Sequence, residues 1–294
     1  MALPRLIFVT GKGGTGKSTV SAALAAALAR HGPTTLADID GRLRAAALVG
    51  TIPTGPDSVR VSDSLDALAL SARTELEAFI RRIVPISAIS RRMLKSRTFG
   101  YVTAALPGLE AFLLLERLRI MAGDAALEDR FIVIDAPASG TALELLGVAA
   151  GVKGIAPAGT LNRLAGAVES FLTDPDRFGV IVTLAPEPLA LREALETASA
   201  LRDRLGIATV AAIMNRTPQP LFDDADLRAL ARVGAHARLA RRRSREHKFA
   251  RAAREELRHA GLESIELPMM FTDTIGAGEV MRLSREIEAE LLRR

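Results

Sequence analysis

Cysteine and tryptophan are absent from this 294-residue sequence, and aromatic residues make up only 4% of it. Without cysteine, the chain forms no disulfide, thiolate zinc site or iron–sulfur cluster, and it has no Cys nucleophile. The scarcity of aromatic rings argues against binding of single-stranded nucleic acid by base stacking. The four histidines include no HExxH pair, so we do not expect a catalytic zinc site either.

Long apolar runs are missing as well. No stretch of 18 apolar residues occurs, and glycines follow the short apolar segment 5–9 at once, so we expect neither a membrane-spanning helix nor a signal peptide. The net charge of +5 is the balance of 39 basic residues, of which 34 are arginines and only five are lysines, against 34 acidic residues. This composition is weak evidence for a nucleic-acid partner. We expect a cytoplasmic protein, at most peripheral at the inner face of a membrane, that does not bind nucleic acid.

Short apolar strands alternate with helical periodicity along the chain. Residues 5–10 form an apolar, β-branched run, and beyond a glycine-rich loop Val20, Leu24 and Leu28 repeat at helical spacing. This pattern predicts a doubly wound α/β fold with a mostly parallel sheet, in a single domain spanning residues 1–294. The expected strands are 5–10, 34–39, 131–135, 179–184, 207–214 and 263–267, with a shorter one at 65–70.

The loop after the first predicted strand carries a phosphate-binding motif. Residues 11–18 read GKGGTGKS and match the P-loop pattern GxxxxGK[ST] between a predicted strand and a predicted helix. The glycines let backbone N–H groups converge on phosphate oxygens, Lys17 reaches the β- and γ-phosphates, and the Ser18 hydroxyl ligates Mg²⁺. The motif predicts binding of ATP or ADP with Mg²⁺ at Gly11, Gly13, Gly14, Thr15, Gly16, Lys17, Ser18 and Thr19.

Lys12 places a second lysine inside this loop. The resulting KGGxGKS sequence resembles the deviant Walker A motif of the Min and Par ATPases, nitrogenase iron protein and the ArsA-type ATPases. The resemblance implies that Lys12 crosses a dimer interface and contacts the partner's nucleotide, where a cation stabilises the charge of the transferring phosphoryl group. The alternative is that Lys12 is a solvated loop residue.

Two aspartates are expected to complete the site. Asp135 ends the apolar run FIVID and looks like the Walker B carboxylate, which holds Mg²⁺ through water. Asp40 follows the strand 34–39 and resembles the family's switch I aspartate, which orients the attacking water. We therefore expect Asp40, with Ser18 and Asp135, to belong to the Mg²⁺ site. Asp38 points to the same side of the strand and competes for this role. Asp40 or Asp135 could instead cap a helix N-terminus.

Later segments resemble one branch of this family, the ArsA-type and tail-anchored-protein-targeting ATPases. DAPASGTALELL (135–146) is similar to their switch II, and similar stretches recur at 106–112 and 172–201. The resemblance implies that Asn215, Pro268 and Met269 contact the adenine. It extends in order over about residues 5–290.

The chain also departs from that branch. Without cysteine it has neither the CxxC zinc site of the targeting ATPases nor the metalloid ligands of the arsenite pumps, so we expect no zinc or metalloid binding through Cys. Switch I reads Asp40-Gly41-Arg42-Leu43, which also resembles the Min pattern, and Thr141 stands where His is common.

Two segments interrupt the alternation of strands and helices. Residues 75–123 are expected to form a helical insertion between the two switches, either an apolar groove facing a client or membrane or simply helices that cover the sheet. Residues 223–260 form an Arg-rich helical segment, which either binds an anionic surface or is a solvated helix face.

These features together predict a Mg²⁺-dependent ATPase of the ArsA-like family. By the resemblance, it acts as a nucleotide-switched homodimer or heterodimer with a paralogue, turns over slowly, and binds an apolar or membrane-associated client. Two alternatives remain open: a Min- or Par-like positioning ATPase on membrane or DNA, and a weakly hydrolysing nucleotide-binding subunit of a hetero-oligomer.

Overall fold

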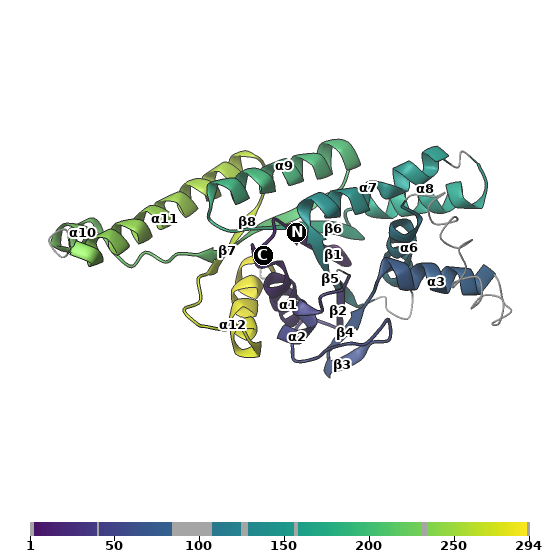
Figure 1. The fold of residues 1–294 in the computed structure, drawn as a ribbon, viewed down its shortest axis with the longest axis horizontal. Helices are drawn as coiled ribbons and strands as arrows, with labels where there is room; N and C mark the ends of the chain where they lie inside the picture. Colours follow the sequence, from purple (N-terminus) through teal and green to yellow (C-terminus); the bar gives the residue numbers. More distant parts are fainter. Residues whose placement is uncertain are drawn as a thin grey trace.

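The computed structural model describes residues 3–39, 41–83, 108–124, 129–155, 158–230 and 234–292. Asp40 therefore lies outside the described residues, as do residues 84–107 of the expected helical insertion and residues 231–233 of the Arg-rich segment. Within the described part, strands and helices alternate along the chain, as the sequence predicts (Figure 1).

The described strands form one eight-stranded sheet with the order β3-β4-β2-β5-β1-β6-β7-β8. Neighbouring strands are parallel except for β3 and β4, which are antiparallel. This confirms the predicted doubly wound, mostly parallel α/β fold. The strands are β1 (Leu6–Gly11), β2 (Thr34–Asp38), β3 (Val59–Ser62), β4 (Leu65–Ala69), β5 (Phe131–Ala138), β6 (Phe178–Leu184), β7 (Thr209–Thr217) and β8 (Ser264–Pro268).

Alternate residues of the central strands enter two separate cores. In β1, Leu6 and Phe8 pack in one hydrophobic cluster, whereas Ile7 and Val9 pack in the other. The period of two follows from the pleat of the strand, and burial of both faces explains why these strands read as continuous apolar runs. Each face is covered by its own layer of helices, as Figure 1 shows.

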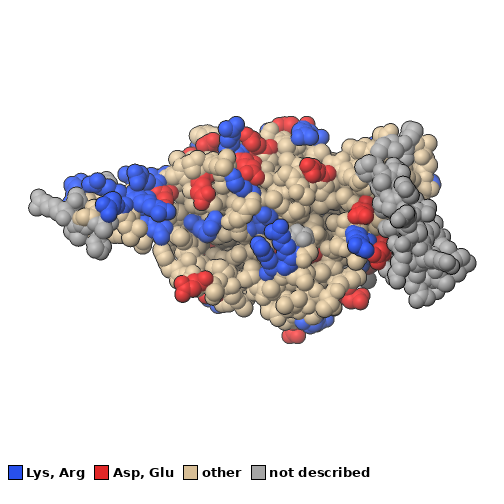
Figure 2. Space-filling view, in the orientation of Figure 1, with Lys and Arg blue, Asp and Glu red and all other residues tan. Residues whose placement is uncertain are grey.

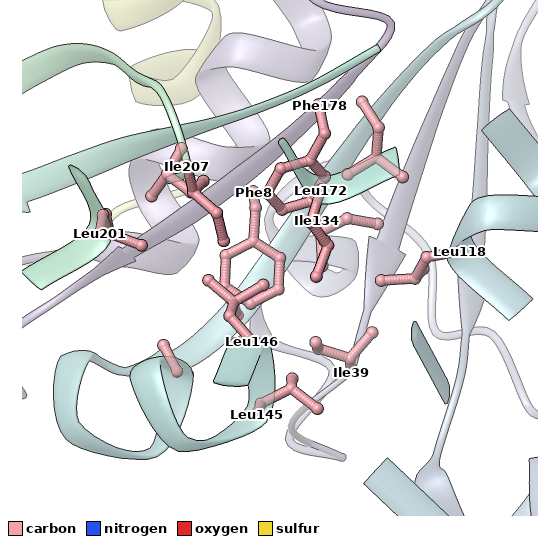
Figure 3. Packing of buried hydrophobic residues seen from close by; sticks show 14 of the residues in the cluster. Phe8, Ile39, Leu118, Ile134, Leu145, Leu146, Leu172, Phe178, Leu201 and Ile207 are labelled. Carbon is pink, nitrogen blue, oxygen red and sulfur yellow. The ribbon is translucent and has the colours of Figure 1, made fainter. Parts of the chain in front are cut away.

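The two helical layers differ in size. The first consists of α1 (Lys17–Leu28), α2 (Arg44–Leu48), α12 (Ala277–Ile287) and the π-helical turn η2 (Glu288–Leu292). The second contains α3 (Ala72–Ile83), α6 (Leu109–Gly123), α7 (Ser139–Ile155), α8 (Thr160–Leu172), α9 (Pro188–Leu205) and α11 (Gly234–His259), with α10 (Asp224–Leu230) beyond it. Its core is seen in Figure 3, where Phe8, Ile134 and Phe178 of the sheet meet helical leucines.

The described parts of the two unusual segments are helical. In α6, Phe112, Leu115 and Leu118 are fully buried, so these side chains cover the sheet. The long helix α11 begins beside α10, away from the sheet, and runs back toward β8 (Figure 1). None of the described helices has both the length and the hydropathy that crossing a bilayer requires.

Candidate nucleotide site

The glycine-rich loop joins β1 to α1 at the carboxyl edge of the sheet. Gly14 and Gly16 adopt positive φ angles of 84° and 91°, a region that residues with a side chain rarely enter. A Cβ atom at Gly16 would collide with Asn215 Nδ2, and one at Gly11 would collide with the Thr183 carbonyl. The loop therefore needs glycine both for its backbone and for the close approach of its neighbours.

Buried threonine hydroxyls fix the loop to the neighbouring strand. Thr15 Oγ1 lies 2.9 Å from the Lys12 carbonyl and 3.0 Å from Thr183 Oγ1 of β6, and Thr183 donates to the Thr10 carbonyl at 3.0 Å. These contacts bridge β1, the loop and β6. They hold the loop in its conformation together with one backbone hydrogen bond, from the Thr15 N–H to the Lys12 carbonyl at 3.3 Å.

Lys17, Ser18 and Thr19 occupy the first turn of α1. The N–H groups of a helix's first turn have no partner within the helix and carry the positive end of its dipole. The first turn of α1 contains no acidic residue that would compensate this charge, and the Lys17 ammonium folds back to the Lys12 carbonyl at 3.4 Å. The structure thus places a cation and a helix N-terminus where the motif requires them.

Two carboxylates lie beside each other at this edge. Asp38, the last residue of β2, is in register with Asp135 of β5, and both are buried. Ser21 of α1 donates to Asp135 Oδ1 at 3.0 Å, so α1 orients this carboxylate next to the turn that carries Ser18. Carboxylate and hydroxyl oxygens are the ligands that Mg²⁺ prefers. No cluster of three or more His, Asp or Glu side chains suited to a metal occurs among the described residues.

Lys12 is paired within its own chain. Its Nζ lies 3.5 Å from Glu193 Oε2 of α9, and both side chains are about one-third exposed. The other oxygen of Glu193 accepts a hydrogen bond from Ser139 Oγ. Ser139 begins α7 and lies within the segment 135–146 that resembles switch II. One carboxylate thus joins the phosphate loop to this segment.

Asn215 lies against the loop from the end of β7. Its buried side chain donates from Nδ2 to the Thr15 carbonyl at 3.0 Å, and its Oδ1 accepts from the backbone N–H of Arg216 at 2.9 Å. The Arg216 guanidinium reaches the Gly14 carbonyl at 3.0 Å. The structure therefore places the predicted adenine-reading Asn215 in contact with the phosphate loop.

Pro268 and Met269 follow at the end of the neighbouring strand. The Met269 N–H donates to the Thr217 carbonyl at 3.0 Å, which fixes this loop to the end of β7. The predicted site residues that the structure describes thus gather along one edge of the sheet, because parallel strands bring their carboxyl ends together. They are the phosphate loop, Asp135, Asn215, Pro268 and Met269.

Three residues of this site were not singled out in the sequence. Thr183 and Glu193 reach the phosphate loop from positions more than 165 residues away, and Arg216 does so from more than 200. A polar residue in the apolar run GVIVTL is a local signal for Thr183. Glu193 lies within the segment 172–201, which resembles a segment of the ArsA-type ATPases. That resemblance does not identify a contact for Glu193.

Comparison with known proteins agrees with this geometry. The family model described as anion-transporting ATPase (ArsA ATPase) matches residues 4–157, more than half of the chain. ATPase BagA from Mycobacterium tuberculosis (strain ATCC 25618 / H37Rv) is 29% identical over 235 residues, covering 76% of this chain and 68% of that protein. A provisionally named arsenical pump-driving ATPase from Halobacterium salinarum is 28% identical over 229 residues, covering 72% of this chain and 35% of that protein. The chain belongs to the anion-transporting ATPase (ArsA ATPase) family.

Proposed function

We propose that this protein is a Mg²⁺-dependent ATPase that switches between open and closed dimers as it binds and hydrolyses ATP. The observation that carries the proposal is the joint placement of a P-loop, a buried carboxylate and a partly exposed second lysine at one edge of the sheet. Family membership supports nucleotide hydrolysis, and the dimer is our inference from Lys12.

The chain's own residues divide the work at the phosphates. Backbone N–H groups of the loop and of the first turn of α1 bind the phosphate oxygens, and Lys17 adds positive charge at the β- and γ-phosphates. Ser18 and, through water, Asp135 are the residues that would hold Mg²⁺. When bound, the metal neutralises charge on the phosphates. Asp40 is our candidate for orienting the attacking water.

Lys12 changes partner in this proposal. In the single chain it is paired with Glu193, but a partly exposed ion pair contributes only about 0–1 kcal/mol and is readily exchanged. In a closed dimer, Lys12 would leave Glu193 and contact the nucleotide of the partner subunit. Because Glu193 also binds Ser139, this exchange would release a contact to the start of α7. Hydrolysis would thereby be linked to a change in conformation.

The client of such a switch is proposed to be apolar. An open pocket of about 310 Å³ lies between α3 and α6, where Phe79, Leu113 and Ile120 line it together with charged residues. This position is within the helical insertion that the resemblance assigns to client binding. The exposed arginines of α11, which form the basic cluster at the narrow end of the molecule in Figure 2, instead favour the alternative, a positioning ATPase on an anionic surface.

Light scattering combined with an ATPase assay tests the proposal. We expect a dimer with a non-hydrolysable ATP analogue, a smaller population of it with ADP, and slow hydrolysis. Lys12→Ala should still bind ATP but lose both dimerisation and turnover. A chain that stays monomeric with the analogue and hydrolyses no ATP would contradict the proposal and favour the role of a nucleotide-binding subunit. Dimerisation and turnover that survive Lys12→Ala would remove Lys12 from the mechanism.

A further inference from the structure

The helix α11 carries nine lysine and arginine side chains, and the structure divides them into two groups. Four arginines form ion pairs: Arg242 and Arg243 with Glu246, Arg254 with Glu266, and Arg258 with Glu255. For the other five cations, no ion pair or hydrogen bond occurs among the described residues, and all five are exposed. We call these five residues the cationic stripe: Arg238, Arg241, Arg245, Lys248 and Arg251.

The members of the cationic stripe share one side of the helix. They follow one another at intervals of three or four residues, the spacing that makes side chains neighbours on the surface of an α-helix. The positions that turn toward the rest of the protein are alanines, and Ala240, Ala250 and Ala253 are buried. At a rise of about 1.5 Å per residue, the stripe extends over about 20 Å. It therefore lies along the outer side of the arm that α11 forms in Figure 1.

The cationic stripe destabilises its own helix. Like charges three or four residues apart on a helix repel one another. Elsewhere on α11 this spacing joins opposite charges, as in the pairs of Arg242 with Glu246 and of Arg258 with Glu255. Along the stripe, each step joins two cations instead. A partner with negative charge would offset this repulsion, so the stripe has the charge pattern of a docking surface for an anion.

The placement of α11 favours a flat anionic partner. A layer of phosphate headgroups presents its negative charge over a plane, so it can meet all five side chains of a helix that lies on it. A nucleic-acid duplex winds its phosphates around an axis, and a helix that reads it commonly enters a groove. Here α10 packs against α11, and Ala250 and Ala253 belong to the core over the sheet, so α11 presents one side only.

We propose that the cationic stripe docks on the anionic surface of a lipid bilayer, with α11 lying flat on the phosphate headgroups. The stripe has no apolar side chain to insert among the acyl chains, so the binding is electrostatic, reversible and weakened by salt. The inference goes beyond the proposed function and does not depend on it, because the stripe lies outside the residues assigned to the nucleotide site.

Co-sedimentation of the full chain with two kinds of vesicle tests this docking surface. One kind is phosphatidylcholine alone, and the other contains about one-quarter phosphatidylglycerol, which is anionic. We expect the protein to sediment only with the anionic vesicles and to be released as the salt concentration rises. Loss of one cation near such a surface weakens binding about fivefold, so Arg241→Gln combined with Arg245→Gln should weaken it about thirtyfold.

A second double variant is matched in charge. Arg254→Gln combined with Arg258→Gln removes as many cations from the same helix, but both arginines are paired with glutamates and lie off the stripe. Its vesicle binding should stay within about twofold of wild type, because charges away from the surface are screened. Thermal unfolding checks the fold, and the stripe variant should be no less stable than wild type, since it relieves repulsion between like charges.

The possible contrary results are distinct. Wild-type protein that stays in the supernatant with anionic vesicles, or that sediments equally with both kinds, would overturn the inference. So would equal binding by the two double variants, since net charge rather than the stripe would then be responsible. A DNA duplex that releases the protein from the vesicles at equal phosphate concentration would assign the stripe to nucleic acid instead of lipid.

Discussion

At the scale of single residues, Glu193 is the group whose removal tests how Lys12 is held. Glu193→Gln keeps the size of the side chain and its hydrogen bond to Ser139 but removes the charge that attracts Lys12. Because the pair is about one-third exposed, its loss should favour the analogue-bound dimer by at most about fivefold. The measurement is the concentration of half-maximal dimerisation with the ATP analogue. A weaker dimer in Glu193→Gln would mean that Glu193 acts in the closed state instead.

The roles of Asp38, which ends β2, and Asp40, which follows it, can also be separated at this scale. Asp40→Asn should lower kcat by at least about a hundredfold, as expected when the group that orients water is lost, while ATP binding persists. Asp38 is fully buried beside Asp135, so Asp38→Asn should chiefly change the thermal stability. Single-turnover hydrolysis together with thermal unfolding distinguishes the two. A large loss of kcat in Asp38→Asn but not in Asp40→Asn would assign the role to Asp38.

How well the site could be predicted depends on how local each residue's signal is. The P-loop residues are contiguous, so a motif reports all of them at once. Glu193 and Arg216 act only because the sheet brings distant strand ends together, and neither residue type at its position carries that information. Asp135 could be predicted because its signal is local: a carboxylate directly ends the apolar run FIVID.

At the scale of elements, continuous apolar runs predicted the buried strands correctly, since both faces of a parallel strand are covered. The strand β3 was missed. Its residues VRVS are mostly exposed, and it pairs only with β4 at the sheet edge, in antiparallel orientation. Such a strand is short and solvent-exposed and is stabilised by pairing with its one neighbour, so its own sequence gives a weak signal.

The contact between α12 and α1 gives a prediction about core packing. α1 is rich in alanine and lies close to its neighbours, and Leu283 of α12 is 1% exposed in the cluster that covers it. Leu283→Ala should lower the free energy of unfolding by about 2–5 kcal/mol, because it leaves a cavity that small side chains cannot fill. Urea denaturation measures this change. A loss below about 1 kcal/mol would mean that α12 is loosely packed.

The same layer has a pH-dependent contact at Glu288. Hydrogen bonds from Arg30, at 2.8 Å, hold the pKa of the Glu288 carboxyl below its usual value. A lowered pKa stabilises the fold above the unfolded-state pKa of about 4.3, and this contribution is lost as the pH falls through the folded-state pKa. Glu288→Gln should therefore lower Tm relative to wild type near pH 7 and lose that difference near pH 3. A difference in Tm independent of pH would contradict this assignment.

At the scale of the whole molecule, mixing two inactive variants decides whether Lys12 acts across an interface. Lys12→Ala keeps its own P-loop, and Lys17→Ala keeps Lys12 but binds nucleotide poorly. In a mixed dimer the Lys12→Ala subunit holds ATP and receives Lys12 from its partner, so an equal mixture should recover up to about a quarter of wild-type turnover. Wild type mixed with Lys17→Ala controls for dilution of active chains. A mixture that is no more active than its two components measured separately would contradict this prediction. Lys12 would then act within its own chain, beside Glu193, and the dimer would have no part in the chemical step.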